Sequence, residues 1–328
     1  MKIAIYGAGA IGGYIGAHLA LAGEDVTLIA RGPHLAVMQQ RGLRLKIGRI
    51  TRVAQPRCVE DPAEAGPQDY VLLTLKAHQL PEVAGRIPSL LGAETAVVTV
   101  QNGVPWWYFH GLAGAEDGAH EGGRLESVDP GGAIWDAVGP RRVIGCIAYP
   151  ATEIEEPGVV RHIEGDRFSL GEPDGSKSQR VRRLAEVFRG AGLRAPVRSR
   201  IRNEMWVKLW GNVAFNPISA LTGMTLAEIC ADPEQRATAR EAMVEAQAVA
   251  NALGETFHID VDQRIEGAAA VGAHRTSMLQ DVDRGRRTEI DAIAGAVAEL
   301  GRLTGVPTPR IDSLHAQVKA LEGRSGLL

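Results

Sequence analysis

The sequence of 328 residues contains only three cysteines, which lie far apart at Cys58, Cys146 and Cys230. It has neither a CxxC pair nor a His/Cys cluster with the spacing of a zinc site, so no metal site is predicted. A small, odd number of separated cysteines is typical of a reducing compartment. The cysteine content therefore favours a cytoplasmic protein with free thiols.

Long apolar runs and an excess of positive charge are also missing. No stretch of about 18 apolar residues without a charge occurs. The short run Ile3–Tyr6 ends at Gly7, with no signal-peptide cleavage site behind it. The formal net charge of −3 provides no positive field that would hold a nucleic-acid backbone. We therefore expect neither a membrane anchor nor a nucleic-acid partner.

The chain is longer than one ordinary hydrophobic core, so two domains are expected. Apolar runs predict strands over residues 2–6, 25–30, 69–75, 95–100, 142–148 and 167–170. Beyond residue 201 strand signals nearly vanish, and helices are predicted over residues 203–220, 233–253, 261–273 and 288–304. The predicted fold class is α/β, with a Rossmann-type domain over residues 1–198 and an all-helical domain over residues 199–328.

The pattern lapses between residues 104 and 140, where we predict an insertion in the first domain. Its middle is rich in glycine, and Trp106, Trp107 and Trp135 lie in or beside it. Buried aromatic side chains usually serve packing, so we favour a hydrophobic anchor that pins the insertion to the domain. The alternative is that these side chains line a larger or more apolar pocket.

A glycine-rich loop follows the first predicted strand. Its residues Gly7, Ala8, Gly9, Ala10, Ile11 and Gly12 fit the pattern G-x-G-x-x-G. A predicted helix over 14–22 and a second strand follow, and this βαβ context is typical of dinucleotide binding. The three glycines provide a tight turn, close backbone approach to a pyrophosphate, and helix–strand packing. The alternative is a structural turn that binds nothing.

Arg31 follows the second predicted strand, where NAD-binding folds usually carry Asp or Glu for the ribose 2′-hydroxyl. A guanidinium would instead bind a 2′-phosphate through charge-assisted hydrogen bonds. The position therefore predicts NADP(H) as the cofactor, the alternative being a solvated loop arginine.

The helical half carries two polar constellations. Lys208, Asn212 and Asn216 recur at every fourth residue, so they share one face of a predicted helix. Spacing alone does not decide between a hydrogen-bonding pocket and the wet face of an amphipathic helix. Ser277 and Asp281 share another helix face, and Glu289 is either a site residue or a first-turn acid stabilised by the helix dipole.

These segments together resemble the ketopantoate reductase family (2-dehydropantoate 2-reductase) over nearly the whole chain. The resemblance rests on separated motifs in the same order: the glycine loop, Thr74–Ala77, Gln101–Gly103, Pro157–His162, Lys208–Pro217, Ser277–Asp281 and Thr288–Asp291. It implies NADPH-dependent reduction of a 2-keto acid, 2-dehydropantoate, to pantoate in pantothenate biosynthesis.

The resemblance also implies residue roles. Lys208 would protonate the developing alkoxide, and Glu289 would orient groups around it. The implied cofactor contacts are the glycine loop, Arg31, Lys76, Asn102, Ala151 and Glu289. The implied substrate contacts are Asn102, Lys208, Asn212, Asn216 and Ser277.

Two departures bear on the substrate. A further substrate-binding asparagine of the family falls on Leu226, and the aromatic insertion follows Asn102 directly. The alternatives are a related reductase of another keto acid or aldehyde, and a non-catalytic NADP(H)-sensing protein. A homodimer formed through the helical half is compatible with the sequence.

Overall fold

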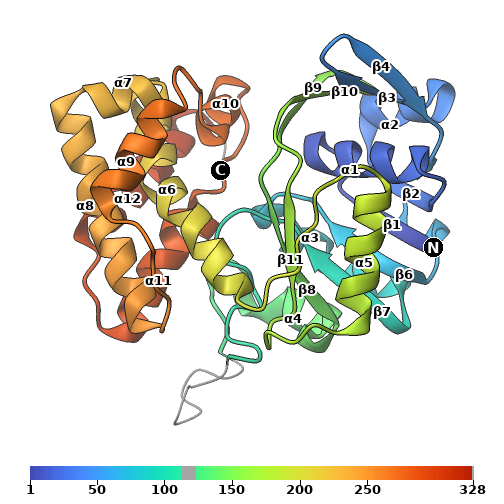
Figure 1. Cartoon of the computed structure of the whole chain (residues 1–328), viewed down its shortest axis with the longest axis horizontal. Helices are drawn as coiled ribbons and strands as arrows, with labels where there is room; N and C mark the ends of the chain where they lie inside the picture. Colours follow the sequence, from blue (N-terminus) through green and yellow to red (C-terminus); the bar gives the residue numbers. More distant parts are fainter. Residues whose placement is uncertain (113–122, 327–328) are drawn as a thin grey trace. The chain divides into compact units, whose positions relative to one another are not determined.

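The computed structural model describes residues 1–112 and 123–326. The chain forms two compact units, coloured along the sequence in Figure 1. The first comprises Met1–Gln101, Trp106–Arg124 and Gly131–Ile201, and the second comprises Asn102–Pro105, Leu125–Pro130 and Arg202–Leu328. Residues 113–122, in the middle of the predicted insertion 104–140, lie outside the described part.

The first unit is built on a seven-stranded sheet with the order β11-β8-β7-β6-β1-β2-β5. Neighbouring strands are parallel except β11, which runs antiparallel to β8. The strands are β1 (Lys2–Tyr6), β2 (Asp25–Ile29), β5 (Arg57–Val59), β6 (Gln68–Leu73), β7 (Leu91–Thr99), β8 (Val143–Ala148) and β11 (Phe168–Gly171). All six predicted strands are present, with ends displaced by a few residues, and the predicted Rossmann-type fold is confirmed.

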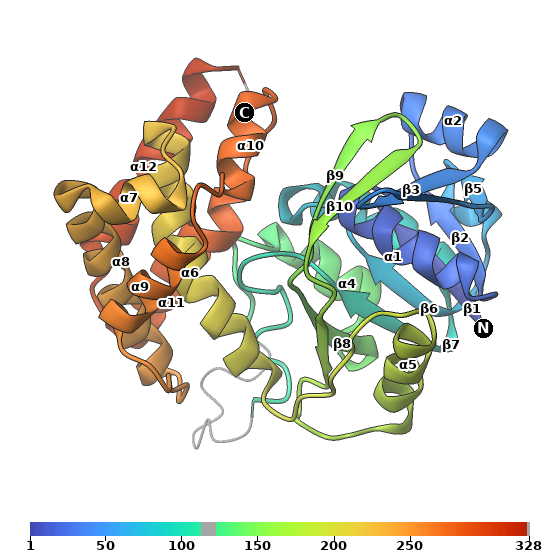
Figure 2. The same ribbon diagram turned by 45° about the horizontal axis from the view of Figure 1, so that its top comes forward.

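Helix α1 (Ala10–Leu21) contacts the large sheet through β1 and β2 and a second, smaller sheet through its four strands (Figure 2). Glycines in α1 allow the helix to pack closely against both sheets. A Cβ on Gly13 would lie 2.8 Å from Val160 Cγ2, and one on Gly16 would lie 2.5 Å from Leu28 Cδ2. The helix begins four residues before the predicted start at Tyr14, because its glycine-rich first turn is helical despite low intrinsic propensity.

The smaller sheet was not predicted. It has the order β4-β3-β10-β9 and consists of β3 (Leu43–Ile47), β4 (Ile50–Ala54), β9 (Ala151–Glu156) and β10 (Val159–Glu164). β3 runs parallel to β10, and the outer pairs are antiparallel. Leu43 and Leu45 are buried on its inner face, whereas Arg44 alternates with them and bonds Glu156 at 2.9 Å. This alternation is typical of a strand with one wet face.

Short helices surround these sheets. They are α2 (Gly32–Arg41), α3 (Leu80–Val83), α4 (Ala133–Val138), α5 (Gln179–Gly190) and the 3₁₀ segments η1 (Pro62–Glu64), η2 (Ala77–Gln79), η3 (Ala84–Leu90), η4 (Pro130–Gly132) and η5 (Pro140–Arg142). α1 and α5 lie on the same side of the large sheet in Figure 1. Their buried side chains, such as Leu19 and Phe188, join one core cluster with strand residues such as Ile5.

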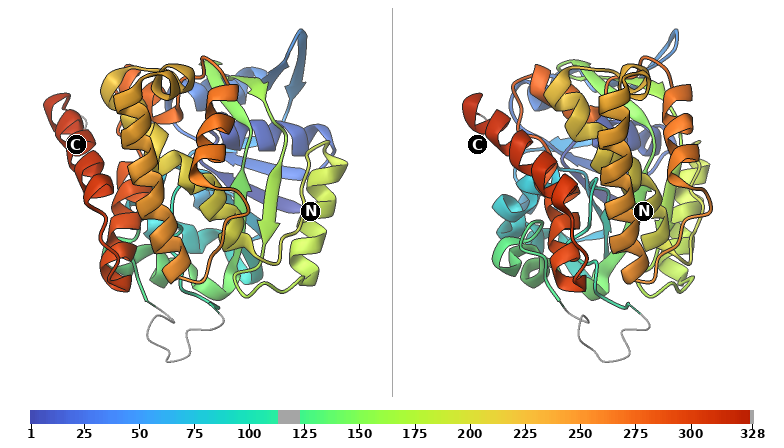
Figure 3. Two further views of the ribbon diagram at one scale, coloured as in Figure 1. Left: turned by 60° about the vertical axis from the view of Figure 1, so that its left-hand side comes forward. Right: turned by 90° about the vertical axis from the view of Figure 1, so that its left-hand side faces the viewer.

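The second unit is helical in its described residues. Its helices are α6 (Ile201–Thr222), α7 (Leu226–Ala231), α8 (Pro233–Ala252), α9 (Val261–Ala270), α10 (Ser277–Asp283), the π-helix η6 (Asp291–Gly295), α11 (Ala296–Thr304) and α12 (Pro309–Arg324). α8 contacts α7, α9, α11 and α12, the last of which is the red helix in Figure 3. The fully buried Trp210 of α6 donates from Nε1 to the Met243 carbonyl oxygen of α8 at 2.8 Å.

Three of the four predicted helices correspond to α6, α8 and α9. The helix predicted over residues 288–304 differs in its first half, because Asp291–Gly295 is π-helical and regular α-helix begins only at Ala296. No described helix is both long enough and apolar enough to span a membrane.

Candidate active site

The glycine loop lies at the carboxyl end of β1, where the strand order of the large sheet reverses. β2 lies on one side of β1 and β6 on the other, and ligands of open α/β sheets bind at the carboxyl ends of strands at such a point. The Thr74 hydroxyl, just after β6, donates to the carbonyl oxygens of Tyr6 and Gly7 at 3.2 and 2.8 Å. Thr74 therefore ties the loop after β6 to the glycine loop.

The three glycines of the loop are required for different reasons. A Cβ on Gly12 would lie 2.3 Å from the Gly7 carbonyl oxygen, and one on Gly7 would lie 2.7 Å from the Leu75 nitrogen. Gly7 also has a φ of +104°. A Cβ on Gly9 would meet only the Gly7 carbonyl oxygen, at 3.9 Å. Packing thus demands glycine at positions 7 and 12, whereas the space next to the N-cap residue Gly9 is open.

The helix behind the loop presents an open positive end. α1 begins after Gly9 without a side-chain cap, and its first turn contains no acidic residue. The first backbone N–H groups of a helix lack intrahelical acceptors and carry a partial positive charge. Such an end suits a phosphate group.

Three other predicted cofactor contacts, Arg31, Lys76 and Ala151, lie in the first unit. Arg31 is exposed at the start of α2, and no described residue forms a hydrogen bond or ion pair with its side chain. Burial raises the pKa of the Tyr6 hydroxyl, which is opposed by the charges of Arg86 and, more weakly, Arg31, so Arg31 lies within electrostatic reach of the end of β1. Lys76 precedes η2, and Ala151 begins β9.

A polar cluster in the second unit joins three predicted site residues that are far apart in the sequence. Lys208 Nζ donates to Asn102 Oδ1 at 2.7 Å, and Asn102 Nδ2 donates to Glu289 Oε2 at 3.1 Å. Glu289 is only 9% exposed, whereas Lys208 and Asn102 are half-buried. The amide therefore has its orientation fixed by a donor on one side and an acceptor on the other.

The backbone around Glu289 is fixed by α12. The Thr288 N–H donates to the fully buried Glu322 Oε1 at 2.6 Å. Asp291 contacts His315 at 2.8 Å and Lys319 at 3.0 Å. Burial alone would raise the pKa of Asp291, but hydrogen bonds from His315 and Lys319 and the charge of Lys319 hold it well below its ordinary value.

Two predicted substrate contacts lie on the same helix as Lys208. Asn212 is half-buried and Asn216 is only 6% exposed. Neither amide has a hydrogen-bond partner in the part of the chain that the structure describes. The polar atoms of both amides are absent from the buried side-chain atoms that lack a partner, so they are open to a ligand or to water.

Ser277 and Leu226 lie at helix starts. Ser277 is exposed at the start of α10, and the described residues give it no contact with Lys208, Asn102 or Glu289. Leu226 begins α7, where its N–H donates to the His274 carbonyl oxygen at 3.0 Å. Ser277 is thus not joined to the cluster by a hydrogen bond in the described part of the chain.

The sequence reasoning missed two residues that shape these loops. Gln101 Nε2 donates to the carbonyl oxygens of Leu73 and Leu75 at 2.6 and 3.1 Å, which ties the loop after β7 to the loop after β6. Thr74 braces the glycine loop as described above. Both stand in motifs that carry the family resemblance, but only the backbone acceptors in the structure explain their roles.

The aromatic residues after Asn102 pack inside the first unit. Trp106 and Trp107 are 3% and 2% exposed. Trp107 Nε1 donates to Thr99 Oγ1 at 2.7 Å, and Trp106 meets Trp135 edge-to-face at 6.0 Å between ring centroids. These are the contacts of a hydrophobic anchor, the interpretation favoured from the sequence.

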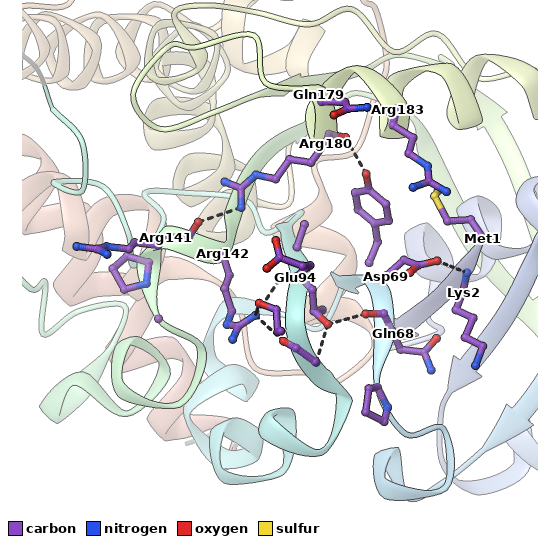
Figure 4. A pocket seen from close by; sticks show the side chains of 18 of the residues that line it. Met1, Lys2, Gln68, Asp69, Glu94, Arg141, Arg142, Gln179, Arg180 and Arg183 are labelled. Carbon is purple, nitrogen blue, oxygen red and sulfur yellow. Dashed lines mark hydrogen bonds between the residues drawn. The ribbon is translucent and has the colours of Figure 1, made fainter.

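A hollow in the first unit, shown in Figure 4, lies at the amino ends of strands of the large sheet. It has a volume of about 1520 Å³ and is lined at the starts of the strands by Lys2, Asp69 and Glu94. Arg142 in its wall is held by the carbonyl oxygens of Gly92, Ala93 and Thr95. Because none of the predicted site residues lines it, this hollow is not the candidate active site.

The described residues contain no group of three or more His, Cys, Asp or Glu side chains that could hold a metal ion. The first unit carries a loop suited to a dinucleotide, and the second carries an ammonium, an amide and a carboxylate joined by hydrogen bonds.

Comparison with known proteins agrees with this geometry. Two family models match: ketopantoate reductase PanE/ApbA over residues 3–106, and its C-terminal counterpart over residues 200–322. A 2-dehydropantoate 2-reductase from Mesorhizobium japonicum is 57% identical over 327 residues, which cover 99% of each chain. The chain belongs to the ketopantoate reductase family. Membership confirms the predicted oxidoreductase class.

Solved structures extend the comparison. A crystal structure from Ralstonia solanacearum MolK2, provisionally assigned as a ketopantoate reductase, superposes with a TM-score of 0.94 at 41% identity, covering 100% of this chain and 99% of that one. A D-mandelate dehydrogenase in a ternary complex with NADH and anilino(oxo)acetate has a TM-score of 0.84 at 26% identity, with full coverage of both chains. A structural relative at 26% identity thus binds the nicotinamide dinucleotide NADH.

Proposed function

We propose that this chain catalyses the NADPH-dependent reduction of a 2-keto acid, with 2-dehydropantoate as the substrate and pantoate as the product, in the cytoplasm. The observation that carries the proposal is the hydrogen-bonded cluster of Lys208, Asn102 and Glu289. The name of the 57% identical relative supports the choice of substrate.

The first unit supplies the dinucleotide site. The open N-terminus of α1 and the unobstructed Gly9 fit a pyrophosphate. The exposed guanidinium of Arg31, with Lys76 beyond the end of β6, fits a 2′-phosphate. Asn102, Ala151 and Glu289 are proposed as further contacts to the cofactor. Bound NADPH would supply the hydride.

Lys208 is proposed as the proton donor. As the keto carbon accepts a hydride, its oxygen gains negative charge and takes a proton from the Lys208 ammonium, which is later restored from solvent. Asn102 Oδ1 holds Lys208 Nζ at 2.7 Å and so limits its motion. Glu289 accepts from Asn102 Nδ2 at 3.1 Å, which keeps the amide oxygen turned toward the lysine.

The amides of Asn212 and Asn216 are proposed to bind the substrate. They lack partners among the described residues, and they share the α6 face with Lys208. Donors fixed in advance stabilise a developing oxyanion better than mobile water does. Ser277, exposed at the start of α10, is proposed as a further contact to the substrate.

The test is NADPH oxidation by the purified protein with a panel of 2-keto acids that includes 2-dehydropantoate. Lys208→Ala should lower kcat by about 10² or more while the Kd for NADPH stays unchanged. Val207→Ala, one residue away and 39% exposed, is the matched control and should keep wild-type turnover. Near-normal kcat in Lys208→Ala would remove the lysine from its role.

A second candidate is reduction of a different 2-keto acid. The superposition on D-mandelate dehydrogenase and the presence of Leu226 at the family's asparagine position favour it. Higher kcat/KM for the aryl 2-keto acid corresponding to mandelate than for 2-dehydropantoate would select this alternative. A non-catalytic NADP(H) sensor would bind NADPH and oxidise it with no member of the panel.

A further inference from the structure

The segment that carries Asn102 is held in the second unit by its backbone. The Val104 N–H donates to the Ala292 carbonyl oxygen at 2.9 Å. Gly103, between Asn102 and Val104, has a φ of +88°, and a Cβ on it would lie 2.2 Å from the same oxygen. Any side chain at position 103 would therefore displace the segment from Ala292.

The Ala292 carbonyl can accept this bond because the helix is a π-helix at this point. In an α-helix the N–H of Ala296 would bond the carbonyl oxygen of Ala292. Here it bonds the carbonyl oxygen of Asp291, one residue earlier. Single π-turns are rare and are found frequently at functional sites. The irregular turn thus leaves a backbone acceptor where the Asn102 segment passes.

The same short stretch also holds the side chain of Asn102. Glu289 Oε2 accepts from Asn102 Nδ2 at 3.1 Å, and three residues later the Ala292 carbonyl accepts from the Val104 N–H at 2.9 Å. One contact lies on each side of Gly103. Together they fix both the position and the rotation of the Asn102 amide.

We propose that Gly103 is a positioning residue of the active site, and that the contact of Gly103 and Val104 with the Ala292 carbonyl sets Asn102 in register with Lys208. This inference rests on the proposed function, because it assigns Gly103 an effect on turnover through Asn102. Gly103 itself touches neither substrate nor cofactor in this role. Glycine is required at this position because the backbone passes so close to the Ala292 carbonyl oxygen that a Cβ would clash with it.

The test is a double-mutant cycle on kcat with Gly103→Ala, Asn102→Ala and the double variant. Each single change should lower kcat by about 10², because a misplacement of about an ångström can cost that much. The kcat of the double variant should lie within a few-fold of the kcat of Asn102→Ala. The effects of the two changes are not additive when the residues act as one unit. Losses that multiply to about 10⁴ would overturn the inference, as would wild-type kcat in Gly103→Ala.

Gly254→Ala is the matched control. Gly254 has a φ of +81°, and a Cβ on it would meet nothing within 4 Å. Gly254→Ala therefore introduces the backbone strain of an alanine at positive φ without a clash such as that between position 103 and the Ala292 oxygen. It should keep wild-type kcat, so a loss in this control equal to that in Gly103→Ala would assign the effect to strain and overturn the inference.

If Gly103→Ala does not fold, replacing Val104 by its α-hydroxy acid removes only the N–H that reaches Ala292. That variant should show the same non-additivity with Asn102→Ala, and additive losses would contradict the inference. A wild-type protein that turns over no 2-keto acid removes the proposed function and the inference together. Wild-type turnover with multiplicative losses removes the inference alone.

Discussion

Replacement of Arg31 by aspartate tests cofactor choice at a single exposed position. The side chain is solvent-exposed and has no ionic partner among the described residues, so its interaction with a phosphate is that of charges in water. Two unit charges 4 Å apart in water interact by about 1 kcal/mol. A 2′-phosphate carries a charge of about −2, so removal of the guanidinium costs about 2 kcal/mol and its reversal about 4 kcal/mol.

A change of about 4 kcal/mol corresponds to roughly a 10³-fold change in the ratio of kcat/KM for NADPH to that for NADH. NADH lacks the 2′-phosphate, and the new carboxylate would accept a hydrogen bond from its ribose hydroxyl. NADH efficiency should therefore stay level or rise while NADPH efficiency falls. The same ratio of kcat/KM values in Arg31→Ala should lie between those of the wild type and Arg31→Asp, about 30-fold below the wild type.

The assay is initial-rate kinetics with each cofactor at low and high salt. Exposed charges are screened within about 8 Å at physiological ionic strength, so the preference of the wild type for NADPH should shrink at high salt while that of Arg31→Ala changes little. Arg57→Asp, an exposed arginine on the edge strand β5, is the charge-matched control. An unchanged cofactor ratio in Arg31→Asp would refute the assignment of NADP(H) to this position.

Two further predictions address the loop and the support of Glu289. Gly9→Ala should leave the melting temperature nearly unchanged but weaken NADPH binding at least tenfold by titration, whereas Gly12→Ala should lose about 1–3 kcal/mol of stability through its clash with a backbone oxygen. Equal Tm losses in both variants would contradict this. Asp291→Asn should lose about 1–3 kcal/mol at pH 7 by denaturant unfolding, because it removes the carboxylate that His315 and Lys319 share. The pKa of Asp291 lies below 3.8 in the folded state, so the stability it adds is complete above about pH 4 and lost as the pH falls further. The difference between wild type and variant should therefore shrink below pH 4, and a difference that does not depend on pH would contradict this origin.

The parts of the fold that sequence could predict depend on local pattern. The first strand, the glycine loop and the helix that follows are contiguous, and each agrees with the others. The smaller sheet was missed although Leu43–Ile47 alternates apolar and polar residues. Its partner β10 lies more than a hundred residues later, and such a pairing is set by tertiary contacts rather than by a local signal.

The π-helix shows a second kind of failure. Residues 288–304 have the spacing of one amphipathic helix, and nothing in that spacing marks a change in hydrogen bonding. The departure coincides with an external donor, the Val104 N–H, which bonds the Ala292 carbonyl oxygen. A contact from a segment some 190 residues away is invisible in the helical periodicity itself.

The site was predictable only in part for the same reason. Spacing placed Lys208, Asn212 and Asn216 on one helix face, and the structure agrees. The contacts of Asn102 with Lys208 and Glu289 join residues 106 and 187 positions apart. The family resemblance named these residues, but their mutual geometry comes from the fold.

The consecutive residues Gln101 and Asn102 form their side-chain hydrogen bonds in different compact units. Gln101 donates to the carbonyl oxygens of Leu73 and Leu75, in the loops of the dinucleotide unit. Asn102, the next residue, bonds Lys208 and Glu289 in the other unit. The chain passes from the first unit to the second between these two residues. Gly103 makes this possible because its lack of a side chain lets the backbone approach the Ala292 carbonyl oxygen. Asn102, which is proposed to contact both the cofactor and the substrate, is therefore hydrogen-bonded within this unit to Lys208, the proposed proton donor.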